Sequence, residues 1–506
     1  MNFLDKIILT ISPEAGLRRM RNRLAAEFVV RKYDAATQGG RRNSGWFRSK
    51  TTAAEEVSVA ANALAATAQE LCRNNPLAHR IKIIWASNMV GSGIRGQVAT
   101  TNKNVRKKAN QALSDWAWST FADFDGHYSF YGLQWLWAAT IVESGGVLIR
   151  KHVDDKGGKE RGLAPVRLQT FEQTMLDATV SKPKVEGHTV LSGIEFDLEG
   201  RPYGYWIKNL DRLTGQISNN PPIFLRKDIE CIHLFRKERS GQHLGVSWLT
   251  QSATTLNKYD TLIDAKLMQD QIAACLGIII SGASSAVGVG NSNSQIEEIE
   301  PGMVHYTDQG ATVTTVTPPS SQGSAQFMEI VRSDIAIGAG LAHTQVTGDY
   351  SKMNFASGRM SKIEFFQTLD YCQKHMLEPG LDTIFRWFSA VYMMSANVNA
   401  RNVLSCSWTY PPRGVVQPKE ELDTLITKVR AGFTTPSAAV KSMGDADGNL
   451  ETVIEQWKVD KQLFGDLPFD IDPSKFSKAG NQLNVDDAAS SNAASPAKKE
   501  GDEDAE

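Results

Sequence analysis

Apolar residues recur at helical spacing in three segments of the first third of the chain. A helical pattern begins near Ala53 and runs to about residue 90. Where this pattern is strongest, a single face carries Ile81, Ile84, Trp85 and Met89. Residues 103–122 form a second pattern, and "YGLQWLWAATIVES" forms a third that stops at Gly145 and Gly146. The sequence therefore predicts three helical segments before residue 146.

The pattern changes at Gly146. Five short segments rich in β-branched and aromatic residues follow, separated by Gly, Pro and Asp clusters. They are "GVLIRKH", "APVRLQTF", "TVLSGIEFD", "PYGYWIK" and "IECIHLF". This composition predicts strands. Residues 50–245 are thus expected to form an α+β domain, with helices first and a mostly antiparallel sheet after them.

Helical spacing returns over 248–275 and again over about 325–341. The first stripe consists of Leu256, Tyr259, Ile263 and Leu267, and the second of Phe327, Ile330, Val331 and Ile335. Between the two helices, "LGIIISGASSAVGVGNSNSQ", "GMVHYT" and "ATVTTVTPP" predict strands around a Gly/Ser-rich loop. Two helices that flank a strand-rich excursion suit an elongated subunit better than a compact enzyme.

A polar segment, "GDYSKMNFAS" at 348–357, follows the second of these helices. It is longer than a plain surface turn and too polar for a buried connection. A long helix is expected after it, marked by Phe365, Leu369, Cys372 and Met376. Pro379 should kink or restart that helix, because proline lacks an N–H and clashes with the preceding turn.

Short helices are expected over 418–464. Gly432 supplies a stop, Thr435 a cap and Pro436 a first helical position. From about Asp472 the chain is polar and Ala/Ser-rich and then acidic, which predicts a disordered tail.

Overall charge is balanced, but the ends differ in sign. The 506 residues include 55 Lys and Arg and 56 Asp and Glu, which argues against binding of polyanions by the whole chain. Residues 1–50 contain eleven basic and four acidic residues, whereas 484–506 contain seven acids and two Lys. Each end is expected to be either a solvated terminus or a contact arm.

The cysteines and the apolar runs indicate a reduced compartment and no membrane span. Five widely spaced Cys without a CxxC suit buried thiols in a reducing cytosol. The N-terminus lacks the apolar core and cleavage site of a signal peptide. The longest apolar run, 273–280, is too short to cross a bilayer.

Two motifs that suggest ligands are better explained by turns. "GSGIRG" at 91–96 matches a dinucleotide fingerprint, with Asp115 beyond it, but a helical pattern precedes it where a strand is required. "DADGN" at 445–449 hints at a calcium loop. Aligning Gly448 with that loop's invariant Gly puts Met443 and Ile454 where carboxylates belong. A helix stop and a polar turn are the favoured interpretations.

Other catalytic and recognition signatures are missing from the sequence. There is no GxxxxGK[ST], HExxH or GxSxG, and the nine His are scattered. A lone His such as His233 is more often structural than catalytic. Residues 418–464 resemble a helix-turn-helix in layout, but Lys441 is the one basic residue of the candidate second helix. A recognition helix normally has more basic residues than that. No cofactor or metal is predicted.

Several stretches in order resemble a known family. "YDAA" at 33–36 precedes an Arg-rich loop and Trp46. Then come "LCRNNPLAHRIKIIWASNMVGSGI", "HLFRKERSGQHLGVSWL", "GDYSKMNFASGRMSKIEFFQ" and "PPRGVVQPKEELDTLITKVRAGFTT". Over about 30–465 the set resembles the portal proteins of tailed bacteriophages, lambda-like family. One departure is Leu244 in "QHLG", where an Arg is expected, and it puts a local Arg contact in doubt.

The resemblance implies an α+β, elongated portal subunit that assembles into a ring, usually of twelve copies. The implied parts are a basic N-terminal arm (1–49), a wing (50–245), a stem helix (246–275), a clip (276–324), a second stem helix (325–341), a tunnel loop (342–358), a long kinked helix with a return to the wing (359–412), a helical crown (413–466) and a disordered acidic tail (467–506).

The function implied is a non-enzymatic channel for double-stranded DNA at one capsid vertex, used in packaging and ejection. The tunnel-loop residues expected near DNA are Asp349, Tyr350, Ser351, Lys352, Asn354 and Arg359. One Lys per subunit becomes a ring of cations, so a weak contact is multiplied by symmetry. Arg359 is an alternative contact to a neighbouring subunit.

The implied partners are other copies of the chain, the major capsid protein, the large terminase subunit and the head–tail adaptor, with a scaffold or internal protease left open. The implied location is the virion, after assembly in the host cytoplasm, with no membrane contact. Rival hypotheses are a nucleotide-binding or hydrolytic enzyme and a helix-turn-helix DNA-binding protein.

Overall fold

The computed structural model describes residues 50–211, 214–274, 278–282, 304–305, 311–315, 324–396, 404–414, 417–443 and 450–464. The chain divides into two compact units, Met1–Glu56 and Val57–Glu506. Of the first unit, the structure describes only the last residues, where α3 (Ala53–Asn74) begins. There the Thr52 amide donates to Glu55 and the Glu55 amide donates to the Thr52 hydroxyl, which together cap the helix.

The helical segments predicted before residue 146 are confirmed, except that the first is divided into two helices and the second ends at Trp118. α4 (Pro76–Val90) follows α3, α5 comprises Lys103–Trp118, and α6 comprises Phe130–Ser144. Asn75 separates α3 from α4, because its side-chain oxygen accepts the amides of Leu77 and Ala78. Its amide nitrogen donates to both carboxylate oxygens of Asp260, at 2.8 and 2.9 Å. This polar side chain, 2% exposed, therefore links the start of α4 to α8.

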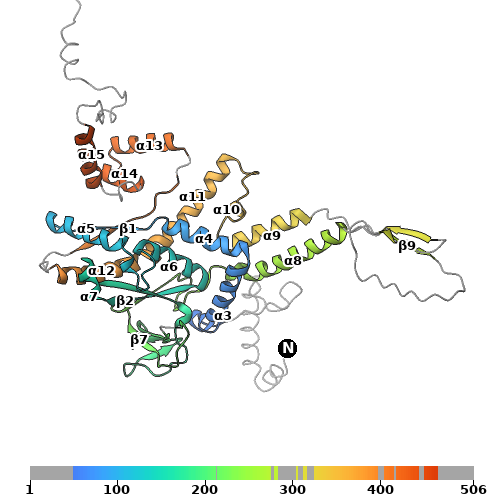
Figure 1. Cartoon of the computed structure of the whole chain (residues 1–506), viewed down its shortest axis with the longest axis horizontal. Helices are drawn as coiled ribbons and strands as arrows, with labels where there is room; N and C mark the ends of the chain where they lie inside the picture. Colours follow the sequence, from blue (N-terminus) through green and yellow to red (C-terminus); the bar gives the residue numbers. More distant parts are fainter. Residues whose placement is uncertain are drawn as a thin grey trace, which may run out of the picture. The chain divides into compact units, whose positions relative to one another are not determined.

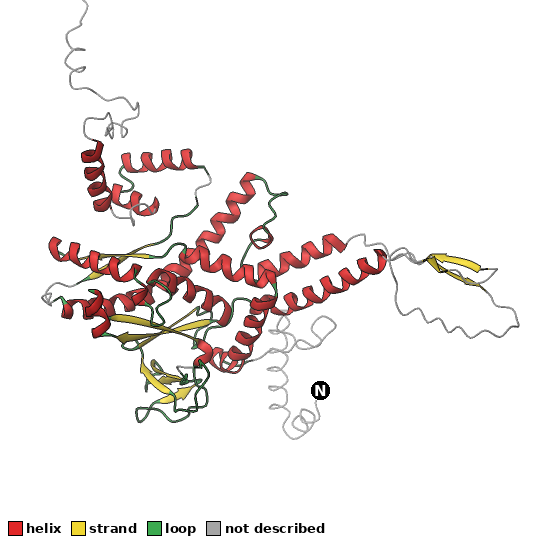
Figure 2. Ribbon diagram, viewed as in Figure 1, coloured by secondary structure: helices red, strands yellow, loops and turns green. Residues whose placement is uncertain are grey.

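The strands after Gly146 are antiparallel, as predicted, but they form two sheets instead of one (Figure 2). The first has the order β3-β2-β8, and the second the order β4-β5-β6-β7. Their bounds are β2 Gly146–Val153, β3 Val166–Glu172, β4 Thr189–Leu191, β5 Ile194–Phe196, β6 Pro202–Ile207, β7 Ile223–Arg226 and β8 Cys231–Phe235. Neither β7 nor α7 (Asp155–Arg161) was predicted from the sequence.

The segment "GSGIRG" is a helix stop followed by an edge strand. Gly91 ends α4 with a positive φ of 53°, and β1 (Arg95–Ala99) follows. β1 pairs antiparallel with β12 (Ser405–Thr409), so residues 405–409 lie beside the strand that connects α4 to α5. Because a helix precedes the glycines and no strand does, the dinucleotide interpretation is not supported.

Two helices flank a small sheet, as the spacing predicts. α8 (Thr250–Ala274) and α9 (Ser324–Gly338) lie side by side and lead to β9 (Ile278–Gly282), β10 (Val304–His305) and β11 (Ala311–Thr315) (Figure 1). The strand order is β10-β9-β11. In the described residues, no helix is both long and apolar enough to cross a membrane.

The long helix after the polar loop is confirmed, and it carries an irregular turn where a break was predicted. α11 (Phe355–Tyr371) continues through a π-helical turn, Cys372–Leu377, into α12 (Glu378–Ser395). The wide turn lies directly before Pro379, whose missing N–H and bulky ring disfavour regular helix there. Gln373 in this turn donates to the Met89 carbonyl at 2.8 Å. The turn thereby satisfies a carbonyl in the last turn of α4.

Three helices end the described chain: α13 (Pro418–Arg430), α14 (Pro436–Met443) and α15 (Leu450–Phe464). The predicted cap is confirmed, because the Ala438 amide donates to the Thr435 hydroxyl at 3.2 Å. Gly432 has a φ of 74°, as its predicted role as a stop requires. The calcium-like segment at 445–449 lies outside the described residues.

One tryptophan joins the main elements of the core. Trp85 on α4 is 1% exposed and donates from Nε1 to the Ala339 carbonyl, just after α9, at 3.0 Å. Its ring centroid lies 4.7 Å from that of Trp248, in an edge-to-face arrangement, and 5.2 Å from that of Phe365 on α11. α4, the end of α9, the start of α8 and α11 therefore meet at one side chain.

Replacing Trp85 tests this junction. We expect Trp85→Ala to lower the free energy of unfolding by about 3–5 kcal/mol, because it opens a large cavity and leaves the Ala339 carbonyl without its donor. Urea unfolding followed by circular dichroism measures the change. Trp457→Ala, at a half-exposed site on α15, is the control and should cost less than about 1 kcal/mol. Equal losses for the two variants would contradict the assignment.

Candidate functional site

The polar segment predicted at 348–357 is shorter in the structure, because helices occupy both of its flanks. α10 (His343–Thr347), a helix that was not predicted from the sequence, ends at Gly348, whose φ is 74°. α11 begins at Phe355, and Asn354 caps it by accepting a hydrogen bond from the Ser357 amide at 2.8 Å. The loop itself is therefore 349–354, called the α10–α11 loop below.

The start of this loop is held by α4. Arg80 donates from Nε to the Gln345 carbonyl at 3.2 Å, and Val346 of α10 is buried. A Cβ at Gly348 would lie 3.2 Å from Arg80 Nη2, and the positive φ there also favours glycine. The core of the protein thus fixes where the loop leaves α10.

The loop is a compact turn stabilised by its own polar groups. Asp349 accepts the Ser351 amide at 2.9 Å, and the Asp349 amide donates to the Thr347 hydroxyl at 3.3 Å. The Met353 amide closes the turn on the Tyr350 carbonyl at 3.1 Å. Hydrogen bonds from the Ser351 hydroxyl and amide lower the pKa of Asp349. Asp349 is therefore charged at neutral pH and shapes the turn.

Lys352, the predicted DNA-facing cation, forms an ion pair with α9. Its Nζ lies 2.9 Å from both carboxylate oxygens of Glu329. The Lys352 side chain is still 76% exposed, against 40% for Glu329. The cation is thus tied to the same subunit while it remains accessible to a second anion.

The pair is stable across the neutral range. The hydrogen bond and charge of Lys352 lower the pKa of Glu329, and Glu329 in turn raises the pKa of Lys352. The contribution of Glu329 is fully present above its ordinary pKa and is lost as pH falls through the lowered value. The contribution of Lys352 is lost only as pH rises through its raised pKa. At neutral pH both groups are charged and paired.

The remaining predicted residues lie on or beside the loop. Tyr350 and Phe355, which borders it, are each more than half exposed, so two aromatic side chains accompany the polar turn. Arg359 lies further along α11 and donates from Nη1 to Gln417, just before α13, at 3.4 Å. The structure brings Asp349, Ser351 and Lys352 into one turn and places Arg359 outside it.

Sequence reasoning missed the partners that hold this site, namely Glu329, Arg80 and Gln417. They lie 23, 265 and 58 residues from the groups that they contact. No local spacing links residues so far apart. Glu329 lies between the partly buried Met328 and the exposed Ile330 of α9, which places it at the margin of the buried face. This position does not identify Lys352 as its partner.

His233, the histidine weighed above as a catalytic group, has hydrogen-bond partners typical of a structural residue. His233 bonds to Gln173 at 3.0 Å, and burial lowers its pKa to about 3. Gln173 also bonds both ways with Gly245, donating at 3.0 Å and accepting at 2.7 Å. Leu244, where an Arg was expected, is buried in the core beside the second sheet. Within the described ranges, no group of three or more His, Cys, Asp or Glu could hold a metal ion.

Comparison with known proteins identifies the family. The family model described as phage portal protein, lambda family, matches residues 39–373. The chain belongs to this family. The match ends in the π-helical turn, so it includes α8, α9, the α10–α11 loop and α11.

Similar proteins match most of the chain. A probable portal protein of Halomonas phage phiHAP-1 is 24% identical over 470 residues, which is 86% of this chain and 88% of the relative. Among solved structures, the neck of a native GTA particle computed with C12 symmetry has a TM-score of 0.44 at 15% identity, covering 74% of this chain and 93% of that one. The virion of a native gene transfer agent gives 0.45 at 14%, covering 76% and 93%.

The Lys352–Glu329 pair leads to a direct test. In Glu329→Gln the loop loses its tie to α9, so we expect trypsin to cleave after Lys352 several-fold faster at neutral pH. Peptide mapping of a limited digest measures the rate. Glu364→Gln, an exposed acid on α11, is the matched control and should digest as the wild type does. Equal rates for all three proteins would show that the pair does not restrain the loop.

Proposed function

We propose that this portal protein assembles into a ring around a channel for double-stranded DNA, through which the genome enters the capsid and later leaves it. The observation that carries the proposal is an apolar surface on α8 and α9 that a single subunit leaves exposed. Membership of the portal family supports the same function. The ring would contain about twelve copies, as the family resemblance implies.

The two helices pack closely where they join the core. The Ser252 hydroxyl donates to the Ile335 carbonyl at 2.8 Å, and Leu256 and Ile335 are fully buried. A Cβ at Gly338 would lie 2.4 Å from Ser252 Oγ, so glycine permits this close approach. The base of the helix pair therefore belongs to the subunit core.

Apolar side chains become exposed toward the far end of the pair. We call these residues the stem surface: Leu267, Met268, Phe327 and Ile330, which are 55%, 63%, 54% and 66% exposed. Leu267 and Phe327 belong to the same predicted stripes as the buried Leu256 and Ile335. Exposed apolar groups that continue a core stripe are typical of a surface that another protein covers. A second copy of the chain is the partner that a ring supplies.

The α10–α11 loop suits a channel that must pass DNA without binding it tightly. Asp349 and Lys352 cancel each other in charge, and Lys352 is also paired with Glu329. Phosphate contacts are strong and depend steeply on salt, so many unpaired cations around a channel would hold the DNA. A paired but exposed Lys352 in each subunit gives a weak, sequence-independent contact.

The finer parts of the proposal follow the family resemblance. Residues 276–324 would form the clip that docks the large terminase subunit and then the head–tail adaptor. Residues 413–466 would form the crown. Portal function requires no chemistry of its own, because ATP hydrolysis would reside in the terminase. The protein would assemble in the host cytoplasm and end at one vertex of the virion, in contact with the major capsid protein.

The stem surface gives a test of assembly. We expect wild-type protein to form rings with a central hole in electron micrographs. Phe327→Ser with Ile330→Ser should shift the population to monomers, since burying the exposed parts of the two side chains contributes on the order of 2–4 kcal/mol per interface between subunits. Leu198→Ser, at an 84% exposed position between β5 and β6, should leave the rings intact. A wild type that stays monomeric under all assembly conditions would overturn the proposal.

Lys352 gives a test of the channel. We expect Lys352→Ala to leave the rings intact and to alter DNA packaging or retention in particles, because it removes the loop cation from every subunit. Lys182→Ala, at an exposed site before β4, is the control and should package as the wild type does. If Lys352→Ala abolished rings instead, the loop would be structural and its role at the DNA would be wrong.

A further inference from the structure

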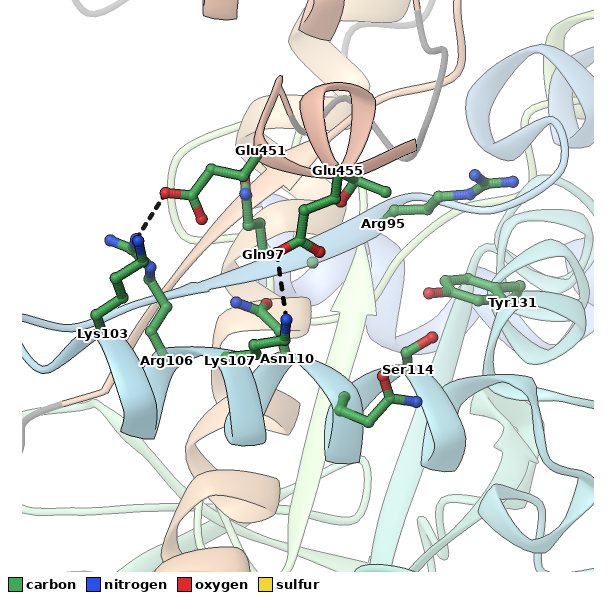
Figure 3. Close-up of a pocket in the computed structure, with 13 residues that line it drawn as sticks. Arg95, Gln97, Lys103, Arg106, Lys107, Asn110, Ser114, Tyr131, Glu451 and Glu455 are labelled. Carbon is green, nitrogen blue, oxygen red and sulfur yellow. Dashed lines mark hydrogen bonds and ion pairs between the residues drawn. The ribbon is translucent and has the colours of Figure 1, made fainter. Parts of the chain in front are cut away.

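A cavity of about 310 Å³ separates α5 and β1 from α15 (Figure 3). The basic residues that line it are Arg95 of β1 and Lys103, Arg106 and Lys107 of α5. Glu451 and Glu455 project from α15 on the opposite side. The cavity is thus a junction between a basic surface and two carboxylates that come from a distant segment of the chain.

Ion pairs connect α15 to α5 at this junction. Arg106 Nη2 lies 2.7 Å from Glu451, and Lys107 Nζ lies 3.2 Å from Glu455. Both carboxylates are more than 60% exposed, so salt screens these pairs and other anions can compete with them. Trp457 and Leu463 of α15 are exposed, and so do not anchor the helix by burial. The contact between α15 and α5 therefore depends on ion pairs, and the two helices can separate.

The basic surface is unfavourable for α5 unless anions lie on it. Lys103, Arg106, Lys107 and Lys108 occupy the first two turns, and the first turn contains no acidic residue. The helix dipole is already positive at this end, so cations there repel it and anions stabilise it. The basic face of α5 therefore favours an anion, and Glu451 and Glu455 supply the negative charge in this structure.

The floor of the cavity is fixed by the core. Asn110 on α5 accepts the Val98 amide at 2.7 Å and donates to the Val98 carbonyl at 3.2 Å, which ties the helix to β1. Ala109, Leu113 and Trp116 of α5 are buried on its other face. The basic side chains therefore project from a rigid element, which is what a binding site requires.

We propose that the basic face of α5, with Lys103, Arg106 and Lys107 at its centre, binds the phosphate backbone of double-stranded DNA outside the channel. Glu451 and Glu455 occupy this face in the DNA-free chain and act as an internal competitor. The choice of DNA as the polyanion rests on the proposed function. Each phosphate replaces a carboxylate at the same cations, so binding DNA releases α15 from α5.

Closed-circular DNA tests the proposal, because a circle has no end to enter a channel. We expect Glu451→Gln with Glu455→Gln to raise the affinity of the full chain for a relaxed circle about fivefold or more in low salt, by freeing about two phosphate contacts. Arg106→Gln with Lys107→Gln should lower the affinity and flatten its salt dependence. Filter binding over a salt series measures both effects.

Matched controls separate local competition from net charge. Glu420→Gln with Asp423→Asn removes two negative charges from α13, and Lys458→Gln with Lys461→Gln removes two positive charges from α15. The variant that combines all four substitutions, at Arg106, Lys107, Glu451 and Glu455, should bind the circle no more tightly than the wild type does. An equal gain in the α13 control, or no loss in Arg106→Gln with Lys107→Gln, would overturn the proposal. If rings assemble but do not bind closed-circular DNA, the proposal for the basic face of α5 is wrong. The proposed channel function is not affected by that result.

Discussion

The indole of Trp85 is the constraint on which the rest of the structure depends. Its N–H is satisfied by the Ala339 carbonyl, and its faces and edges contact Trp248 and Phe365. Gly340 turns the chain beside this ring, where a Cβ would lie 3.4 Å from the indole and φ is 70°. Both helices that border the α10–α11 loop are fixed to this core: α10 through Arg80, and α11 through Phe365. A polar turn can therefore hold one position without being buried.

Burial of apolar side chains decreases with distance from that core in α8 and α9. Near Trp85 their apolar stripes are buried, and toward β9 and β11 the same stripes are exposed. Apolar side chains are exposed in the last part of the described chain as well: Leu463 of α15 and Phe433, between α13 and α14, are about four-fifths exposed. In these exposed regions, ion pairs connect the elements, as between Lys352 and Glu329 and between Arg106 and Glu451. A subunit built in this way has a stable centre and outer regions that neighbouring molecules would complete.

Much of the fold was predictable from the sequence, because local rules determine it. Helical spacing located α4 to α6, α8, α9 and α11, and Thr435 and Gly432 marked helix ends through cap and turn chemistry. Local patterns did not predict that the strands divide into two sheets, because strand partners lie far apart in sequence. They also did not predict that Pro379 is accommodated by a π-helical turn, since that depends on how Gln373 packs against α4.

The candidate site was predictable in position but not in its contacts. The predicted loop, 348–357, includes the turn at 349–354 but also the first residues of α11. Lys352 was predicted beside Asp349 as a weak contact to DNA, and its pairing with Glu329 depends on how α9 lies in space. A reconstruction of the assembled particle tests the central claim most directly. We expect a ring with Asp349 and Lys352 at the channel wall and with Phe327 and Ile330 buried against a neighbour. A ring in which these loops face away from the axis and the stem surface stays exposed would contradict it.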